Sequence, residues 1–176
     1  MNVVFFDVET QRSFDEVGGR HNIRRMGLAA AVTYSTAGGT FRRYTEDQCA
    51  DLVAELRGAD LVVGFNVLNF DYEVLRAYTD DPLDDLPTVD MLDQVYRRLG
   101  FRVGLNALAE ATLGTSKSAD GLQSLAWYRE GKIQEILDYC QQDVEVTRQL
   151  YEYGRQYKHL KYRDRNYRVQ MVPVTW

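Results

Sequence analysis

Residues 2–9, with the sequence NVVFFDVE, constrain the fold of this chain more than any other segment. The positions before the first acid are mostly apolar, which is typical of a central strand buried on both faces of a sheet. Because side chains alternate along a strand, Asp7 and Glu9 at its end point to the same face. Two like charges beside a buried strand repel each other, so the fold must place something nearby that neutralises them.

The remaining pattern alternates between strands and helices. Residues 27–36 and 40–45 flank a Gly-Gly pair and predict a β-hairpin. Short apolar runs predict further strands within 61–66 and 87–92. Helical periodicity predicts helices in the ranges 47–59, 70–78, 93–100, 104–113 and 130–157. This order predicts an α/β fold, a mixed sheet with helices on both faces.

The composition fits one folded domain without a membrane segment. With 176 residues, of which 45% are hydrophobic and 27% charged, the chain can bury a core of ordinary size. No apolar run approaches the length of a membrane span, and the first residues lack the pattern of a signal peptide. Cys49 and Cys140 form no metal-binding pair and are typical of buried, reduced thiols. We therefore expect a cytoplasmic protein with no membrane partner.

The charge is divided unevenly along the chain. The net charge is −5, but residues 155–170 carry six basic residues against the single acid Asp164, so the rest of the chain carries about −10. Such a segment can dock phosphates, and it is equally typical of a solvated helix end and loop. We divide the domain into a main part, residues 1–157, and a basic C-terminal tail, residues 158–176. Whether the last ten residues form a strand or an ordered tail stays open at this point.

Two further acids stand in notable positions. Asp71 follows an apolar strand at the start of a helix, where the helix dipole favours a carboxylate whether or not it has a function. Asp143 lies in the interior of a long helix, where aspartate is a poor helix former. Tyr139 lies one turn before Asp143 on the same face, and such a pair is by itself typical of a helix surface.

Taken together, the acids indicate a metal site. If the elements that carry Asp7, Glu9, Asp71 and Asp143 converge, they form a cluster of oxygen ligands that contains no His or Cys. Such a cluster suits Mg²⁺ or Mn²⁺ and does not suit zinc. Two divalent cations would neutralise the repulsion between Asp7 and Glu9, and they could promote hydrolysis of a phosphodiester.

Three short segments resemble the motifs of a known superfamily. FFDVET, GFNVLNFDYEVL and YCQQD are similar, in order and spacing, to the three motifs of the DEDD superfamily of 3′–5′ exonucleases, which have a ribonuclease H-like fold. The Tyr four residues before the last Asp is similar to the Tyr branch of that superfamily. TVDMLDQVYRRLGFRVGLNALAEATLG further resembles the proofreading domain of family B DNA polymerases and its stand-alone prokaryotic relatives, some of which work in DNA repair beside a helicase.

The resemblance implies roles for eight residues. It implies that two Mg²⁺ or Mn²⁺ ions are held by Asp7, Glu9, Asp71 and Asp143. It implies that Tyr139 orients the attacking water. It also implies that the terminal nucleotide is held by Thr10, Asn66 and Phe70. Phe70 can stack on any base, and it fits a core aromatic equally well.

The implied activity is a metal-dependent 3′–5′ exonuclease that releases nucleoside 5′-monophosphates. The expected partner is a nucleic acid with a free 3′ end, with DNA favoured over RNA. A helicase or other repair protein is a second candidate partner. A second hypothesis, of another class, is a nucleic-acid-binding or helicase-partner module on the same fold with little or no turnover. A third, an endonuclease, is disfavoured by the Tyr-type motif.

Separate predictions concern three further residues and one segment. Asp90 and Asp93 fit helix caps or solvated residues better than acids near the metals. Lys117, in a loop of small polar residues, is a candidate phosphate contact on composition alone. Residues 11–26, which are polar and rich in Gly and Arg, predict a mobile loop beside the end of the first strand.

Overall fold

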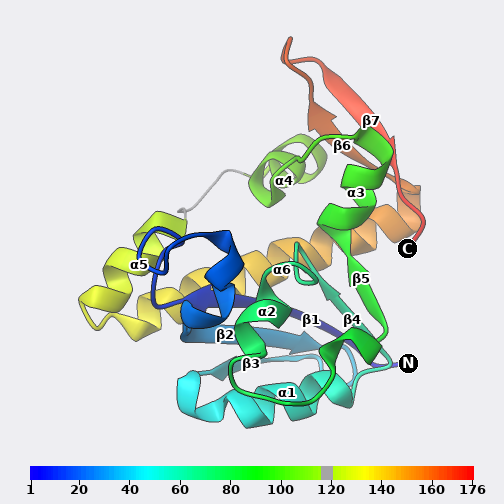
Figure 1. Cartoon of the computed structure of the whole chain (residues 1–176). Coiled ribbons are helices and arrows are strands. Elements are labelled where there is room, and N and C mark those ends of the chain that lie inside the picture. Colours follow the sequence, from blue (N-terminus) through cyan, green and yellow to red (C-terminus); the bar gives the residue numbers. More distant parts are fainter. Residues whose placement is uncertain (116–120) are drawn as a thin grey trace.

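The computed structural model of the chain describes residues 1–115 and 121–176 (Figure 1). Its five-stranded sheet has the order β3-β2-β1-β4-β5, so that the first strand is central. The strands are β1 (Val3–Thr10), β2 (Leu28–Ser35), β3 (Thr40–Tyr44), β4 (Leu61–Gly64) and β5 (Thr88–Asp90). β1 pairs with β2 and β2 with β3 in antiparallel fashion, whereas β4 runs parallel to both β1 and β5. The predicted α/β fold with a mixed sheet is confirmed.

Helices cover both faces of the sheet, as the sequence predicts. The helices are α1 (Cys49–Arg57), α2 (Asp71–Leu75), α3 (Met91–Leu99), α4 (Leu105–Leu113), α5 (Gly121–Arg129) and α6 (Ile133–Tyr157). Short 3₁₀ turns are η1 (Arg20–Arg25), η2 (Glu46–Gln48) and η3 (Leu83–Asp85). Because side chains alternate along β1, Phe5 enters the core beneath α6 and Phe6 enters the opposite core with α1 and α2. Figure 1 shows α6 along one face and α1 along the other.

One helix of the structure has no counterpart in the predicted elements. In α5, Leu122 and Leu125 share one side of the helix but Trp127 lies on another, so no continuous apolar stripe marks it in the sequence. The helix predicted over 130–157 begins at Ile133 instead, after Gly131 with a φ of 71°. Within the two described ranges, no helix combines the length and the apolar surface that crossing a bilayer requires.

The C-terminal residues form a second, two-stranded sheet. β6 (His159–Arg163) and β7 (Val169–Pro173) pair as an antiparallel hairpin, so the open question about the last residues is answered by a strand. Leu160 and Val172 are fully buried in the core beneath α6. Thr112 of α4 accepts a hydrogen bond from the Lys161 amide at 2.8 Å. We call residues 158–173 the C-terminal arm; in Figure 1 its tip projects beyond the helices.

Residues 11–26 lie beside the end of β1, as predicted, and contact both α2 and α5. Their backbone is hydrogen-bonded at both ends: the Arg12 amide donates to the Met26 carbonyl at 3.1 Å, and the Gly19 amide donates to the Phe14 carbonyl at 2.8 Å. Arg129 of α5 pairs with Glu16 at 2.9 Å. These contacts fix the segment against the body, whereas the sequence predicts a mobile loop.

Gly154 lies at the point where Trp176 packs on α6. A Cβ there would meet the indole of Trp176 at 2.7 Å, and that indole stacks on Tyr151 and donates to the Tyr151 carbonyl at 3.0 Å. Helix propensity alone makes Gly→Ala favourable by about 1 kcal/mol. We predict that Gly154→Ala raises the free energy of unfolding by about that amount only in a Trp176→Ala background.

Urea denaturation of the four proteins in this double-mutant cycle measures the coupling. An equal gain from Gly154→Ala with and without Trp176 would contradict the packing described here.

Candidate active site

β1 carries the first two predicted acids on its α6 side. Asp7 and Glu9 follow Phe5 on the same face of the strand. The register between β1 and β2 shifts between Glu9 and Thr10, an irregularity of the kind that re-aims side chains at the end of a strand. The two carboxylates therefore lie where the regular sheet ends.

Asp71 takes the place of a missing strand partner. β4 runs beside β1 only from Val3 to Phe5, so the later amides on that edge of β1 have no ladder partner. Asp71, the first residue of α2, is 2% exposed, and its Oδ1 accepts a hydrogen bond from the Val8 amide at 3.0 Å. The turn before α2 is tight, because a side chain at Gly64 would collide with Val67.

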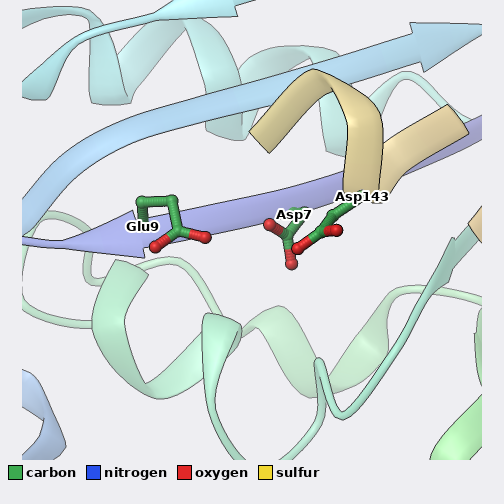
Figure 2. Close-up of side chains that lie close together, drawn as sticks. All are labelled: Asp7, Glu9 and Asp143. Carbon is green, nitrogen blue, oxygen red and sulfur yellow. The ribbon is translucent and has the colours of Figure 1, made fainter. Parts of the chain in front are cut away.

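α6 brings the third motif to the same place. Ligand oxygens of Asp7, Glu9 and Asp143 all lie within 4.8 Å of one another. Figure 2 shows Asp143 reaching from α6 to Asp7, with Glu9 further along β1. Asp71 is outside this close group but lies near enough for its charge to act on Asp7. The structure thus gathers three of the four predicted ligands and places the fourth beside them.

The cluster is electrostatically unfavourable without cations. Burial, followed by the charges of Asp71, Glu9 and Asp143, raises the pKa of Asp7 well above its usual range. Burial also raises the pKa of Glu9 to about 8 and that of Asp71 to about 8. Among the described residues, no Lys or Arg forms an ion pair with Asp7, Glu9 or Asp71. Divalent cations bound by these oxygens would remove the penalty, so the donor set fits Mg²⁺ or Mn²⁺.

Tyr139 lies against the cluster with its hydroxyl protonated. Burial and then the charges of Asp143, Glu9 and Asp7 raise the pKa of its phenol, and a hydrogen bond to Asp143 adds to the effect. The ring packs edge-on against Trp127 of α5, with the ring centres 6.3 Å apart. A phenol held this way at neutral pH can orient a water molecule but cannot act as a base.

An apolar cavity opens beside Asp7 and Glu9. Its volume is about 500 Å³, and it is lined by Asp7, Val8, Glu9, Thr10, Ser13, Phe14, Met26, Phe65, Phe70, Asp71, Leu122 and Leu125. Phe14 and Phe70 meet edge to face across 5.8 Å. Aromatic and aliphatic walls next to a carboxylate cluster suit a nucleobase attached to a reacting phosphate.

A second cavity of different chemistry lies on the other side of Asp143. It has a volume of about 370 Å³ between α4, α6 and the edge strand β3, and it is lined by Phe41, Asn106, Ala109, Thr115, Gln141, Gln142, Asp143, Glu145, Val146 and Gln149. Among the described lining residues, the acid besides Asp143 is Glu145, which is paired with Arg148 at 2.8 Å. We call this cavity the amide groove, because amide side chains dominate its polar surface.

The three predicted nucleotide-binding residues differ in position. Phe70 and Thr10 line the apolar cavity, although the Thr10 hydroxyl donates to the Arg12 carbonyl at 3.0 Å. Asn66 does not line it: its backbone adopts a φ of 69°, and its side chain accepts a hydrogen bond from Arg102 at 3.0 Å.

The structure also places two of the three further residues, Asp90 and Asp93. Asp90 is the N-cap of α3, as predicted, and accepts hydrogen bonds from the Leu92 amide at 3.0 Å and the Asn66 amide at 2.8 Å. Asp93 pairs with Arg97 on the same helix at 2.8 Å. Lys117 lies outside the described residues.

Some residues of the site escape sequence reasoning. The buried thiol of Cys140 donates to the Asp7 carbonyl at 3.2 Å and to its carboxylate at 3.4 Å, and the only sequence signal is its place three residues before Asp143. Phe14 is an aromatic residue in a polar segment, which marks it weakly. Leu125 belongs to α5, which has no clear periodicity and so gives no signal.

Comparison with protein families shows the class of the fold. The model of the RNase_H superfamily matches residues 4–154, so the chain belongs to that superfamily. The ribonuclease H-like fold expected from the three motifs is thereby confirmed, and it is a nuclease fold. No curated protein matches the chain.

Among solved structures, the chain is similar to the family B DNA polymerase of the hyperthermophilic archaeon Pyrobaculum calidifontis. The two share 17% sequence identity with a TM-score of 0.66, over 88% of this chain and 24% of the polymerase chain. The chain therefore spans about a quarter of the length of that polymerase, and the likeness is one of fold.

The raised pKa values predict how stability depends on pH without metals. Glu9 and Asp71 bind protons in the folded state up to a pH of about 8, whereas their ordinary pKa values are 4.5 and 3.8. Between these limits the folded chain holds protons that the unfolded chain releases, so stability must fall as the pH rises. We predict that, in chelator, the free energy of unfolding falls by at least about 1 kcal/mol between pH 5 and pH 8.

Urea denaturation at several pH values, with chelator and with Mg²⁺, checks this prediction. Glu9→Gln should flatten the profile, and Mg²⁺ should stabilise the protein most at the alkaline end. A profile that is flat or rises with pH in chelator would show that the cluster is not strained.

Proposed function

We propose that this protein is a 3′–5′ exonuclease that removes nucleotides from the end of a single strand, DNA in preference to RNA, and releases nucleoside 5′-monophosphates. We further propose that it acts in the cytoplasm in DNA repair or processing. The observation that carries the proposal is the cluster of Asp7, Glu9 and Asp143 with the Tyr139 hydroxyl beside it, next to an apolar cavity large enough to hold a nucleobase.

The ligands of the proposed metal pair are the three clustered carboxylates, with Asp71 beside them. The chemistry that two Mg²⁺ or Mn²⁺ ions supply in such a site is a lowered pKa of the attacking water and stabilisation of charge on the leaving oxygen. The chain's own contribution is positioning. We propose that Tyr139 holds the water by its hydroxyl, while Cys140 contacts the Asp7 carboxylate at 3.4 Å.

The apolar cavity would hold the terminal nucleotide. Phe70 and Phe14 offer ring surfaces to a base, contacts that do not depend on sequence. Thr10 lines the same cavity, where we propose that it contacts the sugar. We propose that these rings, next to the acids, hold the last base of a strand, which would favour cleavage at a strand end over cleavage within a strand.

Asp143→Asn tests the proposed activity with little change in shape. It removes a carboxylate charge from the cluster, so we predict that it abolishes the ladder of products that a 5′-labelled single strand gives with Mg²⁺ or Mn²⁺. Asp138→Asn is the matched control, because Asp138 lies on the same helix but pairs with Arg43 at the surface. That variant should keep about the wild-type rate.

Matched DNA and RNA strands, with and without chelator, complete the measurement. The proposed function would be refuted if Asp143→Asn still shortened the strand one nucleotide at a time. It would also be refuted if the wild-type protein failed to shorten the strand with every metal tested.

Tyr139→Phe isolates the role of the phenol. The ring keeps its packing on Trp127 but can no longer orient water, so we predict that kcat falls by about 100-fold. Binding of Mn²⁺, measured by calorimetry, should be unchanged. An unchanged kcat would exclude Tyr139 from the reaction, and a loss of Mn²⁺ affinity would show that it acts through the ligands instead.

A further inference from the structure

The C-terminal arm concentrates positive charge on an otherwise acidic protein. Its cations are Lys158, Lys161, Arg163, Arg165 and Arg168. Among the described residues, no carboxylate lies within ion-pair distance of Lys158, Lys161, Arg165 or Arg168. Basic side chains on the body do pair with acids, as Arg43 does with Asp138 and Arg57 with Asp81. The arm therefore offers charges that the protein itself does not neutralise.

The one acid of the arm is used to close its turn. Asp164 accepts hydrogen bonds from the backbone amides of Asn166 at 2.8 Å and Arg168 at 3.0 Å, and from the Gln170 side chain at 3.0 Å. These bonds lower the pKa of Asp164, so it stays charged while it shapes the turn. The turn in this way presents Arg165 and Arg168 to solvent.

Tyr167, at the tip of the arm, combines an exposed side chain with a left-handed backbone conformation. Its side chain is 82% exposed, and its backbone has a φ of 59°, in the left-handed region that favours glycine or asparagine. A large aromatic residue in this position helps neither packing nor backbone conformation. An exposed ring between two arginines is instead the arrangement that stacks on a nucleobase while the cations contact phosphates.

The amide groove includes a residue of the metal cluster and lies between two helices that both contact the arm. The groove lies between α4 and α6, and Asp143 is among its lining residues. α4 packs against β6, and α6 ends at Tyr157, just before the arm. From Asp143 to Tyr157 the helix rises by about 21 Å, at about 1.5 Å per residue. A stacked strand covers that length in about six nucleotides, at about 3.4 Å each.

We propose that the C-terminal arm, whose base is reached after about six nucleotides, binds the phosphate backbone of a single-stranded nucleic acid upstream of its 3′ end, with Tyr167 stacked on a base. The strand reaches the arm along the amide groove. The proposal rests on the proposed function only for the position of the 3′ end; binding of the strand by the arm does not require cleavage.

The test measures binding without turnover. Fluorescence anisotropy of labelled single strands, from about four to about sixteen nucleotides long, is recorded in chelator over a range of salt concentrations. With wild-type protein, we expect affinity to rise steeply once a strand exceeds about six nucleotides. Arg165→Gln/Arg168→Gln should lower the salt slope by about 1.4 and weaken binding of long strands by about 20-fold at about 0.1 M salt, because each lost phosphate contact removes about 0.7 from the slope.

Two further variants separate binding from folding and from net charge. Tyr167→Gly suits the left-handed backbone, so it should keep or raise thermal stability while it weakens long-strand binding about tenfold. Arg42→Gln/Arg57→Gln removes the same charge from the body and should leave the slope near that of the wild type.

The outcomes are distinct. Length-dependent binding that is unchanged in both arm variants would overturn the proposal, as would an equal loss in the body control. If the arm variants bound the strand as the wild type does but no longer bound a protein partner, the proposal would be overturned in favour of protein docking. If the proposed nuclease activity is also present, the arm variants should raise KM for long strands and leave kcat on the shortest strands unchanged; a fall in kcat there would contradict a role confined to binding.

Discussion

The repulsion among buried carboxylates at the end of β1 is the constraint on which the rest of the site depends. Asp7 and Glu9 are fixed by the strand, and α6 then adds Asp143 to the same small volume. Burial raises the pKa of each β1 acid, so the fold maintains an arrangement that is unfavourable without metal ions. Such an arrangement is expected where cations complete the structure, and the all-oxygen donor set decides which cations fit.

The surrounding elements explain how the acids can be held so close. The core beneath α6 anchors that helix across β1 and β2, so the packing of α6 brings Tyr139 and Asp143 to the end of β1. Asp90 caps α3 and also binds the turn after β4, which fixes the approach to α2 and Asp71. The acids themselves contribute little to this framework, with the exception of Asp71, which binds the β1 backbone.

The sequence was most informative where a residue's neighbours are close in the chain. The alternation of β1 predicts that Asp7 and Glu9 share a face, and the position of Asp90 predicts a cap; both follow from local geometry. Contacts between distant segments were beyond such reasoning. The thiol of Cys140 reaches Asp7 across 133 positions, and Phe14 meets Phe70 only because residues 11–26 fold back over the strand end. The amide groove likewise joins three elements that no periodicity links.

The exception among the acids is Asp71, whose carboxylate replaces a strand at the edge of β1 by accepting the Val8 amide hydrogen. Removing this side chain would leave a buried amide without a partner, so a loss of function there mixes chemistry with damage to the sheet. Asp143 lies on α6, and the Val8 amide is satisfied by Asp71 instead. An inactive form suited to capturing bound nucleic acid for structural work is therefore better made at the helix than at the strand edge.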